Sequence, residues 1–150
     1  MKLKKIKSKI TNLKHGKKCT IIEPVNIYGS KFEDNVFVGP FVEIQKNTRI
    51  GKNTRVQSHS FICEKVEIGK NCFIGHGVMF INDRFRNGKR AYGDKNKIEK
   101  TEIGNNVLIG SNSTILPVKI CDNVVIGAGS VVVKDINVSG TYVGNPAKPI

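Results

Sequence analysis

The chain has 150 residues, of which 39% are hydrophobic, and its 25 Lys and Arg against 12 Asp and Glu give a formal net charge of +13. This length fits a single domain with its own core, and no apolar run approaches the roughly 20 residues that span a bilayer. The charge attracts anions, such as nucleic acid, acidic lipid or phosphorylated small molecules, without selecting among them.

Residues 1–18 form a basic segment in which lysines are interleaved with apolar residues. The segment lacks a continuous hydrophobic stretch and a small-residue cleavage site, so we do not expect a secretory signal. The four cysteines have no C-x-x-C or metal-ligand spacing, and we interpret them as structural thiols in a reducing compartment. We therefore expect a single domain, 1–150, in the cytoplasm.

A six-residue period begins at Val38. Every sixth residue from there is large and apolar, and all but one are β-branched: Val38, Ile44, Ile50, Val56, Ile62, Ile68, Ile74 and Phe80. A period of six fits neither an amphipathic helix nor a hairpin meander. It is typical of a parallel β-helix, in which each hexapeptide forms one wall and three make a turn of about 18 residues.

The period returns after a break, at Ile103, Ile109 and Ile115, and then slips by one residue through Leu116-Pro117-Val118. We expect this deletion to tighten one corner without ending the coil. Asparagines recur between the apolar positions, where corners with positive φ are expected. They are Asn47, Asn53, Asn71, Asn105, Asn106 and Asn123.

Residues 82–100 interrupt the repeat with many charges and no apolar anchor. A disordered surface insertion is one interpretation. Long loops inside compact repeats are uncommon, however, and insertions usually cluster on the binding face. We interpret the segment as an excursion loop that helps to wall a site between subunits.

Counting about 18 residues per turn places several polar residues where this loop leaves the coil. Asn82 should lie one turn above Glu64, and His59 and His76 should lie on neighbouring turns around one corner. We expect these four side chains to converge near the loop. Acyl transfer needs a base, for which a near-neutral imidazole is suited, and a donor that stabilises the oxyanion.

The repeat matches the pattern [LIV]-[GAED]-x-x-[STAV]-x from about residue 20 onward, and the chain resembles the hexapeptide acyltransferases. The resemblance implies an all-β, left-handed parallel β-helix. The strings VQSHSFICEKVEIGKNCFIGHGVMFINDRF, ILPVKICDNVVIGAGSVVVKDI and GNPAK further resemble bacterial nucleotide-sugar N-acetyltransferases. Those enzymes acetylate the amino group of dTDP-3-amino-3,6-dideoxyhexoses or UDP-linked diamino sugar acids, for lipopolysaccharide O-antigen, capsule or S-layer glycans.

This resemblance implies a metal-free acetyl-CoA-dependent N-acetyltransferase that works as a homotrimer, with acetyl-CoA in the groove between subunits. From the stacking register we expect catalytic roles for His59, His76 and Glu64, although relatives carry His or Asn at the position of His59. Acceptor-binding residues would be Asn82, Asp83 and Arg84. Acetyl-CoA would contact backbone amides of Gly110, Ser111 and Ala128, with its phosphates near Lys134 and Lys148.

Four other functions share features with this sequence. An acetyl-CoA-dependent O-acetyltransferase acting on a hydroxyl, and a noncatalytic β-helix that only binds ligands, both stay open. A γ-class carbonic anhydrase needs three zinc-binding histidines, and the repeats contain two. A nucleic-acid binder would show an aromatic stacking platform, which the sequence lacks. We therefore expect a nucleotide sugar and further copies of the chain as partners, and neither nucleic acid nor a membrane.

Overall fold

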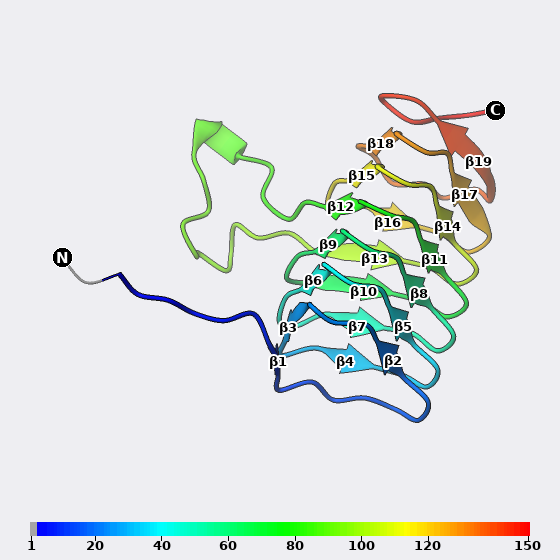
Figure 1. The fold of residues 1–150 in the computed structure, drawn as a ribbon. Helices are drawn as coiled ribbons and strands as arrows, with labels where there is room; N and C mark the ends of the chain where they lie inside the picture. Colours follow the sequence, from blue (N-terminus) through cyan, green and yellow to red (C-terminus); the bar gives the residue numbers. More distant parts are fainter. Residues whose placement is uncertain (1–2) are drawn as a thin grey trace.

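The computed structural model describes residues 3–150 and shows a left-handed parallel β-helix with three walls (Figure 1). Short strands stack directly above one another along each wall, one strand per turn. The single helical element among these residues is the 3-10 helix η1 (Arg86–Gly88), which lies in the excursion loop. The fold predicted from the six-residue period is confirmed.

We name the walls A, B and C. Wall A holds seven parallel strands: β1 (Ile10–Thr11), β3 (Asn26–Tyr28), β6 (Glu43–Ile44), β9 (Phe61–Ile62), β12 (Met79–Phe80), β15 (Thr114–Ile115) and β18 (Val131–Val132). Wall B holds five: β4 (Lys31–Phe32), β7 (Arg49–Ile50), β10 (Val66–Ile68), β13 (Thr101–Ile103) and β16 (Lys119–Ile120). Wall C holds eight: β2 (Thr20–Ile21), β5 (Phe37–Val38), β8 (Arg55–Val56), β11 (Phe73–Ile74), β14 (Leu108–Ile109), β17 (Val124–Ile126), β19 (Gly140–Val143) and β20 (Lys148–Pro149).

The register follows the predicted repeat. Val38 pairs with Val56, three hexapeptides farther along the chain. Ile109 pairs with Ile126, one residue short of three hexapeptides, because the slip at Pro117 shortens that turn. The coil also begins earlier than the regular run of anchors found in the sequence. Ile10 already pairs with Ile27, so the coil extends below Val38 in turns that are likewise one residue short.

The core is a column of inward-facing aliphatic side chains. All eight six-residue anchors from Val38 to Phe80 are at most 2% exposed. Each strand alternates this inward residue with an outward one, as the strand period of two requires. Full burial of one such side chain stabilises the fold by roughly 1.5–3 kcal/mol. β-branched residues suit these short, flat walls because their stiff side chains pack well on a pleated surface.

The corner between walls B and C is built from asparagine. Asn35, Asn53, Asn71, Asn106 and Asn123 all have positive φ, which asparagine tolerates better than most residues. Their side-chain amides hydrogen-bond from one turn to the next, with N···O distances between 2.9 and 3.2 Å. Asparagine at this corner therefore both forms the turn and links successive turns.

The two ends of the coil differ. At the C-terminal end, β20 folds back antiparallel to β19, and Tyr142 and Ala147 pack against the core. At the other end, residues 3–9 run away from the coil instead of covering its first turn (Figure 1). Residues 82–100 leave the coil between β12 and β13, at the corner between walls A and B.

Candidate active site

The corner between walls C and A, the CA corner, gathers five of the residues singled out in the sequence. Backbone hydrogen bonds stack it turn by turn: the Asn112 amide donates to the His76 carbonyl, and the Gly129 amide donates to the Ser111 carbonyl, each at 2.8 Å. This edge of the coil carries His59, His76, Gly110, Ser111 and Ala128.

His59 occupies the left-handed position of its corner, with φ of 63°. Its imidazole is exposed and stacks on the exposed ring of Phe41, one turn below, with 4.9 Å between ring centroids. The stack orients the ring at the edge of the coil, where a ligand can reach its nitrogen atoms.

His76 lies one turn above, beside Gly77. Its backbone N–H donates to the Ser111 hydroxyl at 3.2 Å, and its side chain is exposed. Farther along the same edge, the backbone N–H groups of Ser111 and Ala128 have no acceptor within residues 3–150. The corner therefore offers two imidazoles followed by two available amide donors.

The corner between walls A and B, the AB corner, holds the carboxylate and amide of the predicted site. The Asn82 side-chain amide donates to the Glu64 backbone carbonyl at 3.1 Å, so Asn82 lies one turn above Glu64 as the register predicts. Glu64 is 8% exposed, and its carboxylate accepts a hydrogen bond from the Asn47 amide at 2.8 Å.

The predicted convergence of all four side chains at one corner is wrong for a single chain. His59 and His76 lie at one edge of wall A, and Glu64 and Asn82 lie at the opposite edge. The strands β9 and β12 separate the two edges. His59 and Glu64 are close in the sequence, but the residues between them span a full wall.

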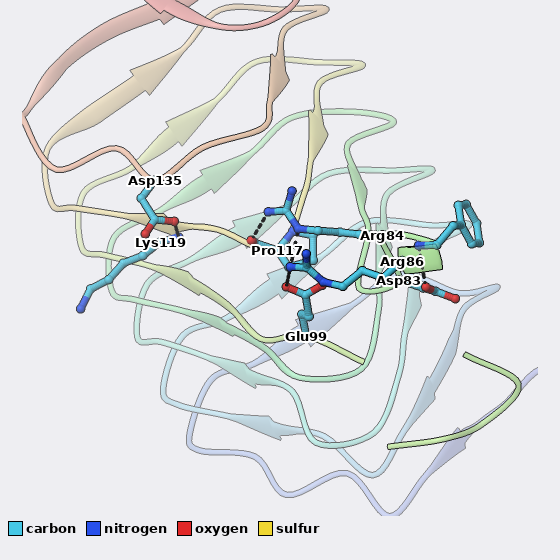
Figure 2. A network of polar contacts seen from close by, with 8 residues as sticks. Asp83, Arg84, Arg86, Glu99, Pro117, Lys119 and Asp135 are labelled. Carbon is cyan, nitrogen blue, oxygen red and sulfur yellow. Dashed lines mark hydrogen bonds and ion pairs between the residues drawn. The ribbon is translucent and has the colours of Figure 1, made fainter. Parts of the chain in front are cut away.

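Asp83 and Arg84, predicted to bind the acceptor, hold the excursion loop in place (Figure 2). The Asp83 carboxylate accepts hydrogen bonds from the Phe85 and Ala91 amides at 2.8 and 2.7 Å. The Arg84 guanidinium donates to the Pro117 carbonyl on the next turn at 2.5 Å. Both side chains are half-buried, so part of each remains accessible to a ligand.

Three loop anchors were missed in the sequence. Arg86 donates two hydrogen bonds to the Glu99 carboxylate, both at 2.9 Å, and this pairing lowers the pKa of Glu99 below its usual range. The Lys65 ammonium donates to the carbonyls of Lys95 and Ile98 at 2.7 and 3.0 Å. No sequence signal marks these contacts, because they depend on the path of an irregular backbone.

Lys134 and Lys148, predicted to meet phosphates, come together at the C-terminal end of the coil. Both line a cavity of about 260 Å³, together with Tyr142, Pro146 and Ala147. The segment that supplies Lys148 crosses above wall A, where the Ala147 amide donates to the Val131 carbonyl at 2.8 Å. Both lysines are exposed, and with one carboxylate from Asp135 the lining of the cavity carries a net charge of +1.

Residues 3–150 contain few other groups that could take part in a reaction. No group of three or more His, Cys, Asp and Glu side chains could hold a metal ion there. Burial raises the pKa of the Cys63 thiol to about 12, so this thiol stays protonated and unreactive. Across the same described residues, no helix combines the length and apolar character needed to cross a membrane.

Comparison with known protein families assigns most of the coil. A family model described as "Bacterial transferase hexapeptide (six repeats)" matches residues 29–64. A second, "Hexapeptide repeat of succinyl-transferase", matches residues 65–79 and 100–134. Together they match more than half of the chain and leave most of the excursion loop unmatched.

Among curated proteins, the chain is 37% identical over 123 residues to the bifunctional protein GlmU of Streptococcus uberis. The match covers 81% of this chain but 24% of GlmU, so the chain spans about a quarter of that relative.

Two solved structures illustrate the similarity. A maltose O-acetyltransferase from Clostridium difficile 630 superposes with a TM-score of 0.62 at 29% identity, over 90% of this chain and 66% of that one. A mutant perosamine N-acetyltransferase from Caulobacter crescentus, in complex with CoA and GDP-perosamine, superposes with a TM-score of 0.67 at 19% identity. The second match covers 94% of this chain and 56% of that one, and shows a shared fold alone.

Proposed function

The chain belongs to the hexapeptide-repeat transferase family, and from that premise we propose that it transfers acetyl from acetyl-CoA to the amino group of a nucleotide-linked amino-deoxy sugar. The proposal rests on the order of groups along the CA corner. Two imidazoles are followed, on the next two turns, by the available backbone amides of Ser111 and Ala128. No metal takes part in the proposed reaction.

The geometry of this edge suits a long, extended ligand. Stacked strands lie about 4.8 Å apart, so the three turns from His59 to Ala128 rise roughly 14 Å. An arm bearing amide carbonyls, such as that of CoA, can lie along this edge and accept hydrogen bonds from Ser111 and Ala128. Its phosphates would then extend beyond Ala128 to the C-terminal end of the coil, where a cavity is lined by Lys148, on the segment that crosses above wall A, and by Lys134, at the far edge of that wall.

In the proposed reaction the acceptor nitrogen attacks the thioester carbonyl carbon and forms a C–N bond. The tetrahedral intermediate collapses with cleavage of the C–S bond, and the sulfur leaves as a thiolate. His59 accepts the proton that the amine loses, or orients the amine, and the proton passes on to the thiolate. His76 assists from the neighbouring turn.

We propose that a homotrimer completes the site. Wall C presents a column of outward-facing apolar side chains, Phe73, Leu108 and Val125, which are 38, 45 and 38% exposed. Packing of this column against a neighbour would bring the AB corner and excursion loop of one subunit to the CA corner of the next. Glu64, Asn82, Asp83 and Arg84 would then shape the acceptor pocket opposite His59.

An O-acetyltransferase is the second candidate, favoured by the similarity to the maltose O-acetyltransferase. The nucleotide sugar is favoured by charge, since the chain beyond its first 18 residues still carries a net +5, which attracts polyanionic substrates. The proposed setting is surface glycan biosynthesis in the cytoplasm, where acetyl-CoA is made. A hydroxyl acceptor depends more strongly on a base than a free amine does, so the two candidates differ in their dependence on His59.

A panel assay of thiol release from acetyl-CoA tests the proposal. The acceptors are dTDP-3-amino-3,6-dideoxyhexoses, UDP-linked amino sugars, the corresponding hydroxyl sugars, and maltose. We expect turnover with at least one amino-sugar nucleotide and none with its hydroxyl counterpart. Turnover with hydroxyl acceptors alone would establish O-acetylation instead. Thermal stabilisation by CoA and nucleotide without any thiol release would indicate a binding protein.

A further inference from the structure

The positive charge of the chain is concentrated in the N-terminal part of its sequence. Residues 1–18 contain 8 of the 25 Lys and Arg, and no acidic residue precedes Glu23. This segment therefore carries +8 of the net +13, and the rest of the chain, with 17 basic and 12 acidic side chains, carries only +5. The proposed reaction does not use this asymmetry, because its cationic residues lie at the opposite end.

Apolar side chains are exposed among these lysines. Leu3 and Ile6 are each 77% exposed on the arm of residues 3–9, and Ile10 and Ile22 are 40 and 45% exposed on the first turn. The arm extends away from the coil and leaves the first turn open (Figure 1). A cavity of about 430 Å³, lined by Ile10, Leu13 and Ile21 among others, opens at this end.

We propose that residues 3–22, which we call the basic end, dock on an anionic lipid bilayer. Lysine clusters are drawn to anionic headgroups by roughly 1 kcal/mol per residue near the surface. Apolar side chains inserted between the headgroups add to that attraction. Leu3 and Ile6 have i, i+3 spacing, so one turn of helix formed at the interface would direct both toward the lipid. The sequence alone predicted no membrane partner, and the basic end revises that expectation without requiring a spanning segment.

Other occupants fit less well. A nucleic acid would contact the lysines but leave Leu3 and Ile6 unused, and the chain has no aromatic side chain before Tyr28 to stack on bases. A second copy of the basic end would place a charge of +7 against +7. An anionic bilayer can bind the lysines through its headgroups and can also take up the exposed apolar side chains.

Vesicle flotation with the full chain tests the proposal. We expect co-flotation with vesicles containing about 30% phosphatidylglycerol and none with pure phosphatidylcholine, with binding that weakens as salt rises. The triple variant K4Q/K5Q/K7Q should lower the partition coefficient about a hundredfold. The matched control K89Q/K134Q/K148Q removes the same charge from exposed lysines on the excursion loop and at the opposite end of the coil, and it should bind vesicles as the wild type does. Equal losses in both variants would overturn the proposal, as would tighter binding to a short DNA duplex than to vesicles.

Insertion can be measured directly because the chain has no tryptophan. Ile6→Trp should show a blue-shifted emission and protection from an aqueous quencher when anionic vesicles are added. Val138→Trp, an exposed position near the opposite end, should show neither change. An unshifted Ile6→Trp spectrum with vesicle-bound protein would mean that Ile6 does not insert and would overturn this docking mode.

Discussion

The His59 imidazole stacks on the Phe41 ring one turn below, with 4.9 Å between ring centroids and 29° between ring planes. Both residues have positive φ, at 63° and 59°, so the stack joins two left-handed corners. Phe41 is the surface against which the imidazole is oriented. Ring orientation and proton transfer can therefore be separated by substitution.

His59→Asn should lower kcat/KM for the preferred acceptor by about a hundredfold, the usual contribution of general acid–base catalysis. Asparagine adopts positive φ throughout the corner between walls B and C, so the melting temperature should change little. Phe41→Leu, which removes only the stacking surface, should cost less than fivefold. Steady-state kinetics on purified variants measures both. Activity of His59→Asn within threefold of wild type would remove His59 from the mechanism.

Asn71 stands in the middle of the asparagine corner, bonded to Asn53 below and Asn106 above. Asn71→Ala should destabilise the fold by about 2–3 kcal/mol, because two hydrogen bonds are lost and alanine disfavours positive φ. Asn71→Gly loses the same bonds without that backbone cost and should lose about 1–2 kcal/mol. Urea unfolding at fixed protein concentration measures both, with Lys52→Ala as the neutral control. Equal losses in the two Asn71 variants would show that backbone conformation contributes nothing there.

The fold was predictable because inward side chains must recur at a fixed interval. Anchors such as Ile62 and Ile74 keep that interval through the central turns, and even the slip at Pro117 could be located. The first turn, which begins at Ile10, was missed for a physical reason. Its step to the next turn, from Ile10 to Ile27, is one residue short of three hexapeptides, and this turn buries its apolar side chains only partly.

The site was less predictable than the fold. Spacings of about one turn correctly place His76 near His59 and Asn82 above Glu64, because stacking preserves register. These spacings do not show that two residues close in the sequence can lie at different corners. His59 and Glu64 do so because the strand β9 lies between them. Loop contacts such as that of Arg86 with Glu99 follow no period at all.

The lowered pKa of Glu99 predicts how the loop responds to acid. Its hydrogen bonds to Arg86 make the folded-state pKa lower than the unfolded value, near 4.5, so the folded state binds fewer protons in this range. The stabilisation is present above pH 4.5 and is lost as pH falls through the lowered pKa. Glu99→Gln should therefore melt below wild type at pH 7, with the difference vanishing in acid. Thermal unfolding from pH 3 to 7 measures this, and a constant difference across that range would contradict the assignment. Glu23→Gln, an exposed carboxylate outside the loop, serves as the control.

Asp83 closes the loop by accepting the Phe85 and Ala91 amides. Asp83→Ala leaves both donors without their acceptor and should loosen residues 84–97. Trypsin should then cut after the exposed Arg86, Lys89 or Arg90 at least tenfold faster than in wild type. Asp83→Asn retains one carbonyl acceptor and should fall between the two. Unchanged cleavage in Asp83→Ala would show that the carboxylate does not hold the loop.

Leu108 tests whether wall C is the face that joins subunits. It lies in the outward column between Phe73 and Val125 and is 45% exposed, so Leu108→Glu should fold normally as a single chain. In a trimer the new carboxylate would be buried against apolar neighbours without a partner, a cost of several kcal/mol. Sedimentation should therefore show a monomer where the wild type shows a trimer. Because His59 would lose the loop supplied by the adjoining subunit, kcat/KM should fall at least a hundredfold. Lys31→Glu, on the charged outer face of wall B, should remain trimeric and active. A wild-type monomer with full activity would place the entire site within one chain, where the two corners lie a wall apart.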